Sequence, residues 1–265
     1  MGDASSWIDR DAAVVWHGFT QMASYATNRP LIVERGERRE LIDVEGNRYL
    51  DAISSLWVTT LGHGVPELDQ AVRDQLDRVA HTTMLGNGNR IVIELAEALA
   101  PRVPVDRPRF LFASDGAAAV EQALKIAFQF WTNQGVTGRT RYLAFGGAYH
   151  GDSIGSLSVG DGGFGTDVFD PLRFPVLRAP SLSEPGAVDA AVALIEAHAA
   201  ELAAVVLEPL VQGAAGMALV PAEAVAAVAR AAAAHDVLVI HDEVATGFGR
   251  TGTLFATEQC GTRPD

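Results

Sequence analysis

The stretch VLVIHDEVATGFGRTG, residues 237–252, decides the fold. It begins with a short apolar run typical of a buried strand and continues directly into Asp242, Glu243 and a glycine-rich turn. A carboxylate at the end of a buried strand costs free energy unless it is paired. Because ligands of open α/β sheets bind beyond the carboxyl ends of the strands, the stretch predicts both a parallel sheet and a polar site at its edge.

Three further apolar runs upstream have the same form, each followed at once by polar or glycine residues. Alanine-rich stretches with helical spacing lie between them, and strands that alternate with helices are typical of a mostly parallel sheet with helices on both faces. We therefore predict an α/β fold. The predicted strands are 110–112, 142–145, 204–207 and 237–240, and the predicted helices are 118–134, 188–199 and 222–234.

The N-terminal part of the chain has a different pattern. Between about residues 30 and 57, short apolar runs alternate with turn residues, which predicts a small meander of strands. Apolar residues then recur with helical spacing over 68–79 and again over 91–98. The change of pattern predicts a second, smaller α+β region before the parallel sheet.

Composition narrows the class of partner. The chain has 265 residues, 48% of them hydrophobic, and a net charge of −13. Nucleic acids and anionic membranes attract clustered positive charge, so we expect neither as a partner. The single cysteine, Cys260, excludes an intrachain disulfide, and the sequence contains neither a basic, apolar leader nor an 18-residue apolar run. These features predict a cytoplasmic protein that acts on small molecules.

Three motifs carry candidate chemistry, each with a plainer alternative. Residues 114–121 can place a phosphate on a helix N-terminus, or can be a strand-to-helix turn with an Asp or Ser cap. In GGAYHGD, residues 146–152, Tyr149 can stack on a planar ligand and His150 can orient a neighbour, or the loop can be a surface turn. Asp242 can pair with a pyridinium nitrogen, bind a metal together with Glu243, or cap the next segment. The His and carboxylate residues lack compact metal-ligand spacing, so we expect no metal.

Five segments in order along the chain are similar to class III aminotransferases, which are fold type I enzymes that depend on pyridoxal 5′-phosphate (PLP). The resemblance runs from Trp16 to Asp265, and its segments together are highly specific. They are WHGFTQM (16–22), LDAISSLW (50–57), GGAYHGD (146–152), EPLVQG (208–213) and DEVATGFGRTG (242–252).

The resemblance implies roles for individual residues. Gly116 and Ala117 are expected to bind the PLP phosphate, Tyr149 to stack near the ring, Glu208 to support the cofactor from beneath, and Asp242 to bond the pyridine nitrogen. The residues expected to shape the substrate pocket are Phe19, Trp57, Tyr149, Asp152 and Arg250. Residues 1–60 are expected to form the N-terminal part of a small domain, and 61–265 an incomplete PLP-binding large domain. The resemblance also implies a homodimer for the full-length protein.

The sequence departs from the family pattern at positions expected to bind the PLP phosphate, at positions expected to contact the substrate, and in the lysine expected to bind PLP. Ala117 offers only its backbone where members often have Ser or Thr, Phe19 replaces a tyrosine of some members, and Leu56 precedes Trp57 where many have two tryptophans. The one lysine, Lys125, lies inside the helix after the phosphate loop. The Schiff-base lysine of the family comes further along than residue 265, so we expect a truncated chain that is inactive alone.

Within the family, the resemblance is strongest to the branch that makes 7,8-diaminononanoate in biotin synthesis. The expected reaction moves an amino group from S-adenosylmethionine, or lysine, to the keto acid 8-amino-7-oxononanoate. Two alternatives stay open. One is another class III aminotransferase for ω-amino acids or diamines, and the other is a PLP-binding fragment without catalytic activity.

Overall fold

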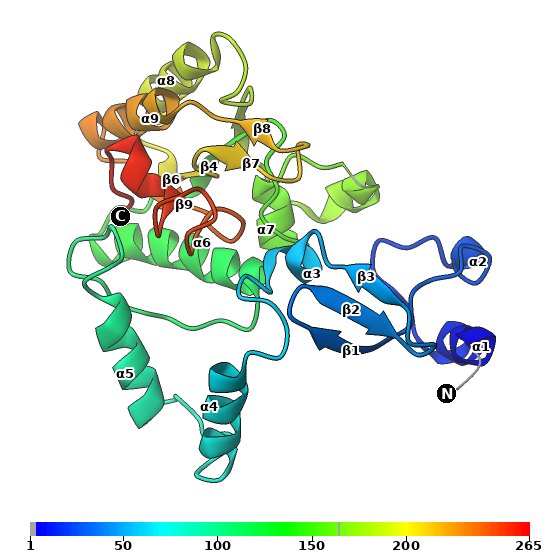
Figure 1. The fold of residues 1–265 in the computed structure, drawn as a ribbon. Helices are drawn as coiled ribbons and strands as arrows, with labels where there is room; N and C mark the ends of the chain where they lie inside the picture. The colour runs from blue at the N-terminus through cyan, green and yellow to red at the C-terminus, as the bar shows by residue number, and fades with distance from the viewer. Residues whose placement is uncertain (1–3, 164) are drawn as a thin grey trace. The chain divides into compact units, whose positions relative to one another are not determined.

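The computed structural model describes residues 4–163 and 165–265. The chain divides into two compact units, Met1–Asn89 and Arg90–Asp265, and each is described by itself (Figure 1).

The first unit contains the antiparallel meander that the sequence predicts. Its strands pair in the order β1-β2-β3, and the carboxylate of Asp43 closes the turn between β2 and β3 by accepting from the backbone N–H groups of Glu45 (2.9 Å) and Asn47 (2.8 Å). The elements of this unit are α1 (Ala4–Val14), α2 (Met22–Tyr25), β1 (Val33–Glu37), β2 (Glu40–Asp43), β3 (Arg48–Leu50), α3 (Ser54–Trp57) and α4 (Pro66–Leu76).

The meander ends earlier than predicted, because residues 54–57 form a left-handed turn. All four residues of α3 have positive φ, from 48° at Ser55 to 71° at Trp57, and none of them is glycine. A left-handed helical residue costs about 1–2 kcal/mol for an L-amino acid, because its Cβ approaches the next carbonyl oxygen. The surrounding contacts must therefore hold this turn in place.

The second unit is built on a four-stranded parallel sheet with the order β5-β4-β6-β9. Its elements are α5 (Arg90–Leu99), α6 (Gly116–Asn133), β4 (Arg141–Phe145), α7 (Ile154–Val159), η1 (Thr166–Leu172), β5 (Leu177–Ala179), α8 (Ala187–His198), β6 (Leu202–Leu207), β7 (Val211–Gln212), β8 (Ala218–Leu219), α9 (Ala222–Ala234), β9 (Leu238–His241) and η2 (Ala256–Cys260).

Helices cover both faces of this sheet, which confirms the predicted fold class (Figure 1). On one face α8 and α9 pack through residues such as Ile195 and Val228, and on the other α6 packs through Val120 and Leu124. All six residues of β6 are buried, which explains its unbroken apolar sequence.

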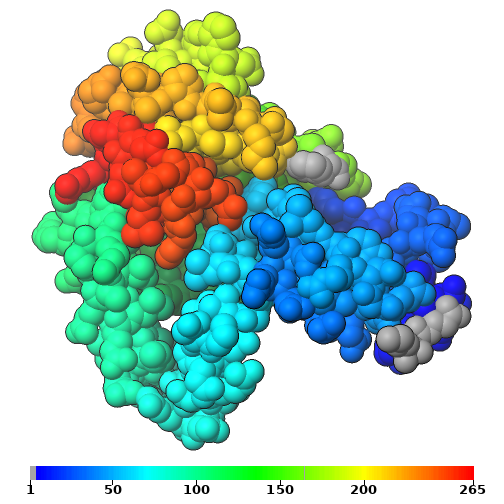
Figure 2. All heavy atoms as spheres, viewed as in Figure 1, coloured from blue at the N-terminus to red at the C-terminus, as the bar shows by residue number. Residues whose placement is uncertain are grey.

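The alanine-rich helices are ordinary packed helices. Ala191 on α8 and Ala232 on α9 are fully buried, and small side chains at such positions let the two helices lie close together. Helix α9 also contacts η2, and the space-filling view shows the C-terminal residues, in red, lying against this helix (Figure 2). Among residues 4–163 and 165–265, no helix combines the length and the apolar character needed to cross a bilayer.

One predicted strand, 110–112, is not part of the described sheet, and one strand of that sheet, β5, was not predicted. Residues 110–112 have no regular secondary structure, no described segment pairs with them, and Leu111 is 62% exposed. A strand needs a hydrogen-bonded neighbour as well as an apolar run. Conversely, β5 has only three residues and no apolar run, so nothing in its sequence announced the pairing with β4.

Candidate functional site

The carboxyl ends of β4, β6 and β9 lie at one edge of the sheet, as the sequence predicts. Residues 146–152, Glu208 and Asp242 follow these strands directly. The N-terminus of α6 lies beside the same edge. A Cβ atom at Gly116 would be 3.0 Å from Cγ2 of Val244, which is two residues beyond Asp242. The segments thus converge although they are far apart in the sequence.

Asp242 forms a pair with His150 at the centre of this edge. The two atoms Asp242 Oδ2 and His150 Nδ1 are 2.8 Å apart, and the His150 side chain has no exposed surface. The other carboxylate oxygen accepts from the N–H of Val244 (3.0 Å), and the N–H of Asp242 donates to the carbonyl of Leu207 (2.8 Å). These contacts orient the carboxylate, and His150 is the orienting neighbour that the sequence allowed for.

The side chain of the next residue, Glu243, contacts the start of η2 and not the Asp242–His150 pair. Its carboxylate accepts from the backbone N–H groups of Ala256 (2.7 Å) and Thr257 (2.9 Å), so it caps the N-terminus of η2. This capping role accounts for Glu243 without a metal ion.

Tyr149 and Asp152 face each other across one turn of the loop after β4. The Tyr149 hydroxyl donates to Asp152 Oδ2 at 2.9 Å. Burial, the hydrogen bond to Asp152 and the charges of Asp152 and Asp242 raise the pKa of Tyr149 to about 12. The phenol therefore stays neutral near pH 7 and acts as a hydrogen-bond donor.

Glu208 joins the end of β6 to that loop. One of its oxygens accepts from the N–H of Tyr149 (3.1 Å) and the other from the N–H of Gly213 (3.2 Å). Burial raises the pKa of Glu208, and the neighbouring His150 and the two backbone donors oppose that rise. The carboxylate fixes the backbone that carries Tyr149.

Sequence reasoning missed the residues that hold the loop from outside. Gln212 Nε2 donates to the carbonyl of Gly146 (3.0 Å), and Asp161 accepts from the N–H of Gly147 (2.7 Å). Gly151 has φ 116° and meets α6 so closely that a Cβ there would lie 2.5 Å from the Cβ of Ala117. Gln212 lies in the family-like segment EPLVQG, and membership of that segment is the one sequence feature that could have indicated its role.

Glu121 is a second missed contact, one turn into α6. Its carboxylate accepts from the Ser153 hydroxyl (2.6 Å) and from the N–H of Gly155 (2.7 Å), so it ties the start of α7 to α6. No sequence spacing joins residues so far apart along the chain.

The remaining predicted residues lie elsewhere. Arg250 is exposed on the turn that follows Asp242, in the second unit. Phe19, 66% exposed, and Trp57, partly buried, belong to the first unit. The sequence prediction that these two join the site stays a prediction.

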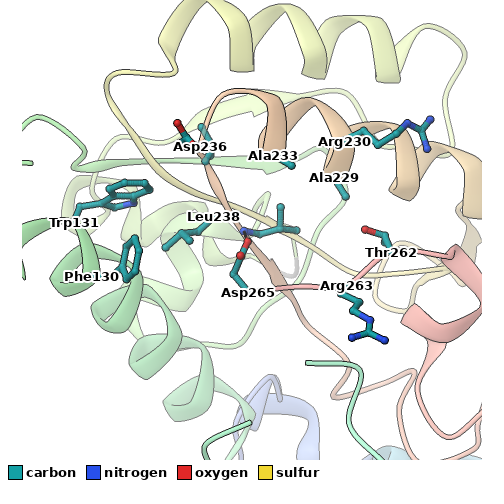
Figure 3. Close-up of a pocket in the computed structure, with 12 residues that line it drawn as sticks. Phe130, Trp131, Ala229, Arg230, Ala233, Asp236, Leu238, Thr262, Arg263 and Asp265 are labelled. Atoms are coloured by element: carbon teal, nitrogen blue, oxygen red, sulfur yellow. Dashed lines mark hydrogen bonds between the residues drawn. The ribbon is translucent and has the colours of Figure 1, made fainter. Parts of the chain in front are cut away.

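A cavity of about 430 Å³ lies at the opposite end of β9 from Asp242 (Figure 3). Trp131, Asp236 and Arg263 contribute to its lining. Val239 on β9 exchanges hydrogen bonds with Asp265, whose carboxylate accepts from the Val239 N–H (3.0 Å). The cavity is therefore separate from the polar edge that carries Asp242.

His241 should make the stability of this unit sensitive to acid. It is largely buried, with Nδ1 2.6 Å from the Thr257 hydroxyl, and burial lowers its pKa from 6.5 to about 4. As the pH falls below 6.5, His241 becomes protonated in the unfolded chain, but in the folded chain it stays neutral until about pH 4. The free energy of unfolding therefore decreases as the pH falls across this interval. We expect about 2 kcal/mol to be lost between pH 7 and pH 5.

Urea denaturation at both pH values measures this loss. His241→Asn should remove most of the difference, whereas His81→Asn, at an exposed histidine, should retain it. An equal pH dependence in both variants would show that another group is responsible.

The donor set at the sheet edge fits a flat aromatic ligand with a basic ring nitrogen and a phosphate group. The first turn of α6 offers backbone N–H groups to an anion, and Asp242 uses two of its four lone-pair positions, leaving acceptor capacity for a ring N–H. His150 Nε2 is also buried without a partner among the described residues. The fold and these donors and acceptors therefore match the cofactor site of a group-transfer enzyme.

Comparison with known proteins identifies the class. The chain belongs to the class III aminotransferase family, whose model matches residues 21–265. It is 46% identical to the adenosylmethionine-8-amino-7-oxononanoate aminotransferase of Nitratidesulfovibrio vulgaris, over 96% of this chain and 50% of that protein. The chain thus spans about half the length of this curated relative.

Solved structures agree. The crystal structure of the Methanocaldococcus jannaschii enzyme of the same name superposes with a TM-score of 0.94 at 41% identity, covering 97% of this chain and 58% of that one. An amine transaminase from an uncultivated Pseudomonas species, in its PLP-bound form, superposes with a TM-score of 0.86 at 31% identity, covering 95% and 60%. The predicted family and fold type are confirmed.

Proposed function

We propose that this chain carries the cofactor site of a PLP-dependent aminotransferase of biotin synthesis. The reaction transfers an amino group from S-adenosylmethionine or lysine to 8-amino-7-oxononanoate and yields 7,8-diaminononanoate. The observation that carries the proposal is the Asp242 carboxylate, oriented by His150 at the sheet edge beside the N-terminus of α6. The names of the two oxononanoate relatives support the substrate.

Four segments would hold PLP: the start of α6, the loop with Tyr149, Glu208 and Asp242. The backbone N–H groups of Gly116 and Ala117 would bind the phosphate at the positive end of the α6 dipole. Tyr149 would cover one ring face, and Glu208 would support the cofactor through its bonds to the Tyr149 loop. When bound, PLP supplies an electron sink that stabilises negative charge on the α-carbon of an amino donor.

Asp242 would keep the ring nitrogen protonated. A carboxylate beside the pyridine nitrogen favours the charged ring, and the ring draws electrons most strongly when protonated. His150 would keep the carboxylate turned toward that nitrogen, because it binds Oδ2 from a fully buried position. The neutral Tyr149 hydroxyl would remain a donor over the whole working pH range.

Five side chains are proposed to contact the substrates: Phe19, Trp57, Tyr149, Asp152 and Arg250. The aromatic members suit the aliphatic chain of the keto acid, and Arg250 suits a carboxylate. Asp152 offers a negative charge for an ammonium group and Arg250 a positive charge for a carboxylate, and both groups occur on the proposed substrates.

Lys125 is a poor candidate for the lysine that binds PLP. It is exposed on α6, nine residues after Gly116, which corresponds to about 13 Å along the helix axis. We propose that the cofactor lysine lies in a part of the protein outside these 265 residues, in keeping with the greater length of the relatives.

The remaining proposals concern organisation. We propose that residues 1–60 belong to the small domain and 61–265 to the PLP-binding large domain, and that the full-length protein is a cytoplasmic homodimer. Sedimentation of the full-length protein with PLP tests the dimer directly.

The activity is tested on the full-length protein with PLP, 8-amino-7-oxononanoate and, separately, S-adenosylmethionine and lysine. We expect mass spectrometry to detect 7,8-diaminononanoate with one of the two donors, with pyruvate acceptor as a control for unspecific transfer. Absence of the product with both donors, from a protein that binds PLP, would reject the substrate assignment.

A second candidate is an amine or ω-amino acid transaminase, supported by the likeness to the Pseudomonas amine transaminase. The higher identity to the oxononanoate enzymes favours the first candidate. Turnover of simple amines with pyruvate, without turnover of the oxononanoate, would favour the second.

A further inference from the structure

The left-handed turn α3 (Ser54–Trp57) needs a support that lies outside it. Four consecutive non-glycine residues with positive φ are unfavourable by themselves. The turn closes on itself through the hydrogen bonds from the N–H of Trp57 to the Ile53 carbonyl (2.8 Å) and from the N–H of Val58 to the Ser54 carbonyl (3.0 Å). Right-handed turns make the same kind of bond without the steric cost, so these bonds do not select the left-handed form.

Asp51 supplies contacts to the turn from outside it. Its Oδ1 accepts from the backbone N–H of Ser55 (2.8 Å), and its Oδ2 accepts from the Ser55 hydroxyl (2.8 Å). The Asp51 side chain is only 6% exposed. Ser55 is the second residue of the turn, and both its backbone N–H and its hydroxyl donate to the Asp51 carboxylate. This double contact depends on the backbone angles at Ser55.

His63 fixes the carboxylate in turn. His63 Nε2 lies 2.8 Å from Asp51 Oδ2, and the N–H of Asp51 donates to the carbonyl of Arg39 (2.9 Å). Arg38 and His63 exchange backbone hydrogen bonds of 2.9 and 2.5 Å, and a Cβ at Gly36 would lie 2.5 Å from Cγ of the His63 ring. The imidazole is therefore pressed against the end of β1, and Asp51 is held between the sheet and the turn.

We infer that Asp51 and His63 are positioning residues, which hold α3 in its left-handed form and thereby set where the Trp57 indole points. The contacts of Asp51, Ser55 and His63 all lie within the unit Met1–Asn89. The consequence for substrate rests on the proposed function, in which Trp57 contacts the keto acid. We call Asp51 and His63 together the clamp. Its loss lets residues 54–57 relax toward right-handed angles, which turns the Trp57 side chain away from its present direction.

Fluorine NMR of the chain labelled with 5-fluorotryptophan tests the positioning itself. The chain has four tryptophans, and Trp57→Phe identifies the signal of Trp57. In Asp51→Ala we expect the Trp57 signal to shift or broaden while the other three stay in place. Ser54→Gly, which removes the steric cost of a left-handed residue, should move the Trp57 signal of Asp51→Ala back toward its original position.

The matched control is Asp43→Ala. Asp43 is a buried carboxylate of the same unit that also accepts several hydrogen bonds, but it closes the β2–β3 turn instead. The Asp43→Ala variant should have a lower free energy of unfolding but an unmoved Trp57 signal. If Asp51→Ala does not fold, Asp51→Asn and His63→Gln replace it. A folded variant with an unmoved Trp57 signal overturns the inference.

The full-length enzyme separates this inference from the proposed function. We expect Asp51→Ala to raise the KM for 8-amino-7-oxononanoate on the order of tenfold to a hundredfold, with a smaller change in kcat. A moved Trp57 signal with an unchanged KM would leave the clamp standing and reject the assignment of Trp57 to the substrate pocket.

Discussion

Replacing Asp242 by asparagine is expected to lower kcat/KM of the full-length enzyme on the order of 10²- to 10³-fold, the loss typical of removing one preorganised electrostatic contact. Asparagine keeps the size of the side chain and an oxygen for the Val244 N–H. It carries no charge, so it no longer favours a protonated pyridine nitrogen. The electron sink weakens while the fold remains.

Two measurements distinguish this effect from a loss of structure. The absorbance of bound PLP should change in Asp242→Asn, and the free energy of unfolding should fall by no more than about 2 kcal/mol. Asp236→Asn is the control, because Asp236 precedes the other end of β9 and is exposed. Equal kcat/KM in the two variants would remove Asp242 from the proposed cofactor site.

Replacing Gly151 by alanine is expected to destabilise the second unit by roughly 2–4 kcal/mol. The new Cβ would lie 2.5 Å from the Cβ and 2.8 Å from the Cα of Ala117, so relief requires the loop or the first turn of α6 to move. Residue 151 also has φ 116°, which an alanine adopts only with strain. Movement of α6 would displace the N–H groups proposed to bind phosphate.

Urea denaturation gives the loss of stability, and titration with PLP gives the loss of affinity. Gly186→Ala is a matched control, because Gly186 has φ 79° but no atom within 4 Å of its Cβ position. It should cost only the strain of a left-handed alanine, about 1 kcal/mol. Equal effects at both glycines would mean that backbone strain, and not the contact with Ala117, governs residue 151.

Much of the sheet could be predicted from the sequence. Apolar runs that end in polar residues indicated β4, β6 and β9, and the helical spacing of alanine and valine indicated α8 and α9. The placement of residues 146–152, Glu208 and Asp242 along one edge followed from a general property, since parallel strands present their carboxyl ends on the same side.

Other features depend on contacts between distant residues. His150 and Asp242 are separated by 92 positions, and each has several reasonable partners when only the sequence is considered. Residues 110–112 and β5 differ in whether a neighbouring strand pairs with them, and pairing is a property of the folded chain.

The sequence by itself therefore determined the class of fold, the family and the edge at which chemistry-bearing side chains gather, because these depend on local periodicity and on the order of motifs. The tertiary structure alone decided how the carboxylates are used: Asp242 with His150, Glu243 as a cap for η2, and Asp51 beneath a left-handed turn. A carboxylate accepts hydrogen bonds from any donor that folding brings within reach, so its role is settled by neighbours that no local pattern specifies.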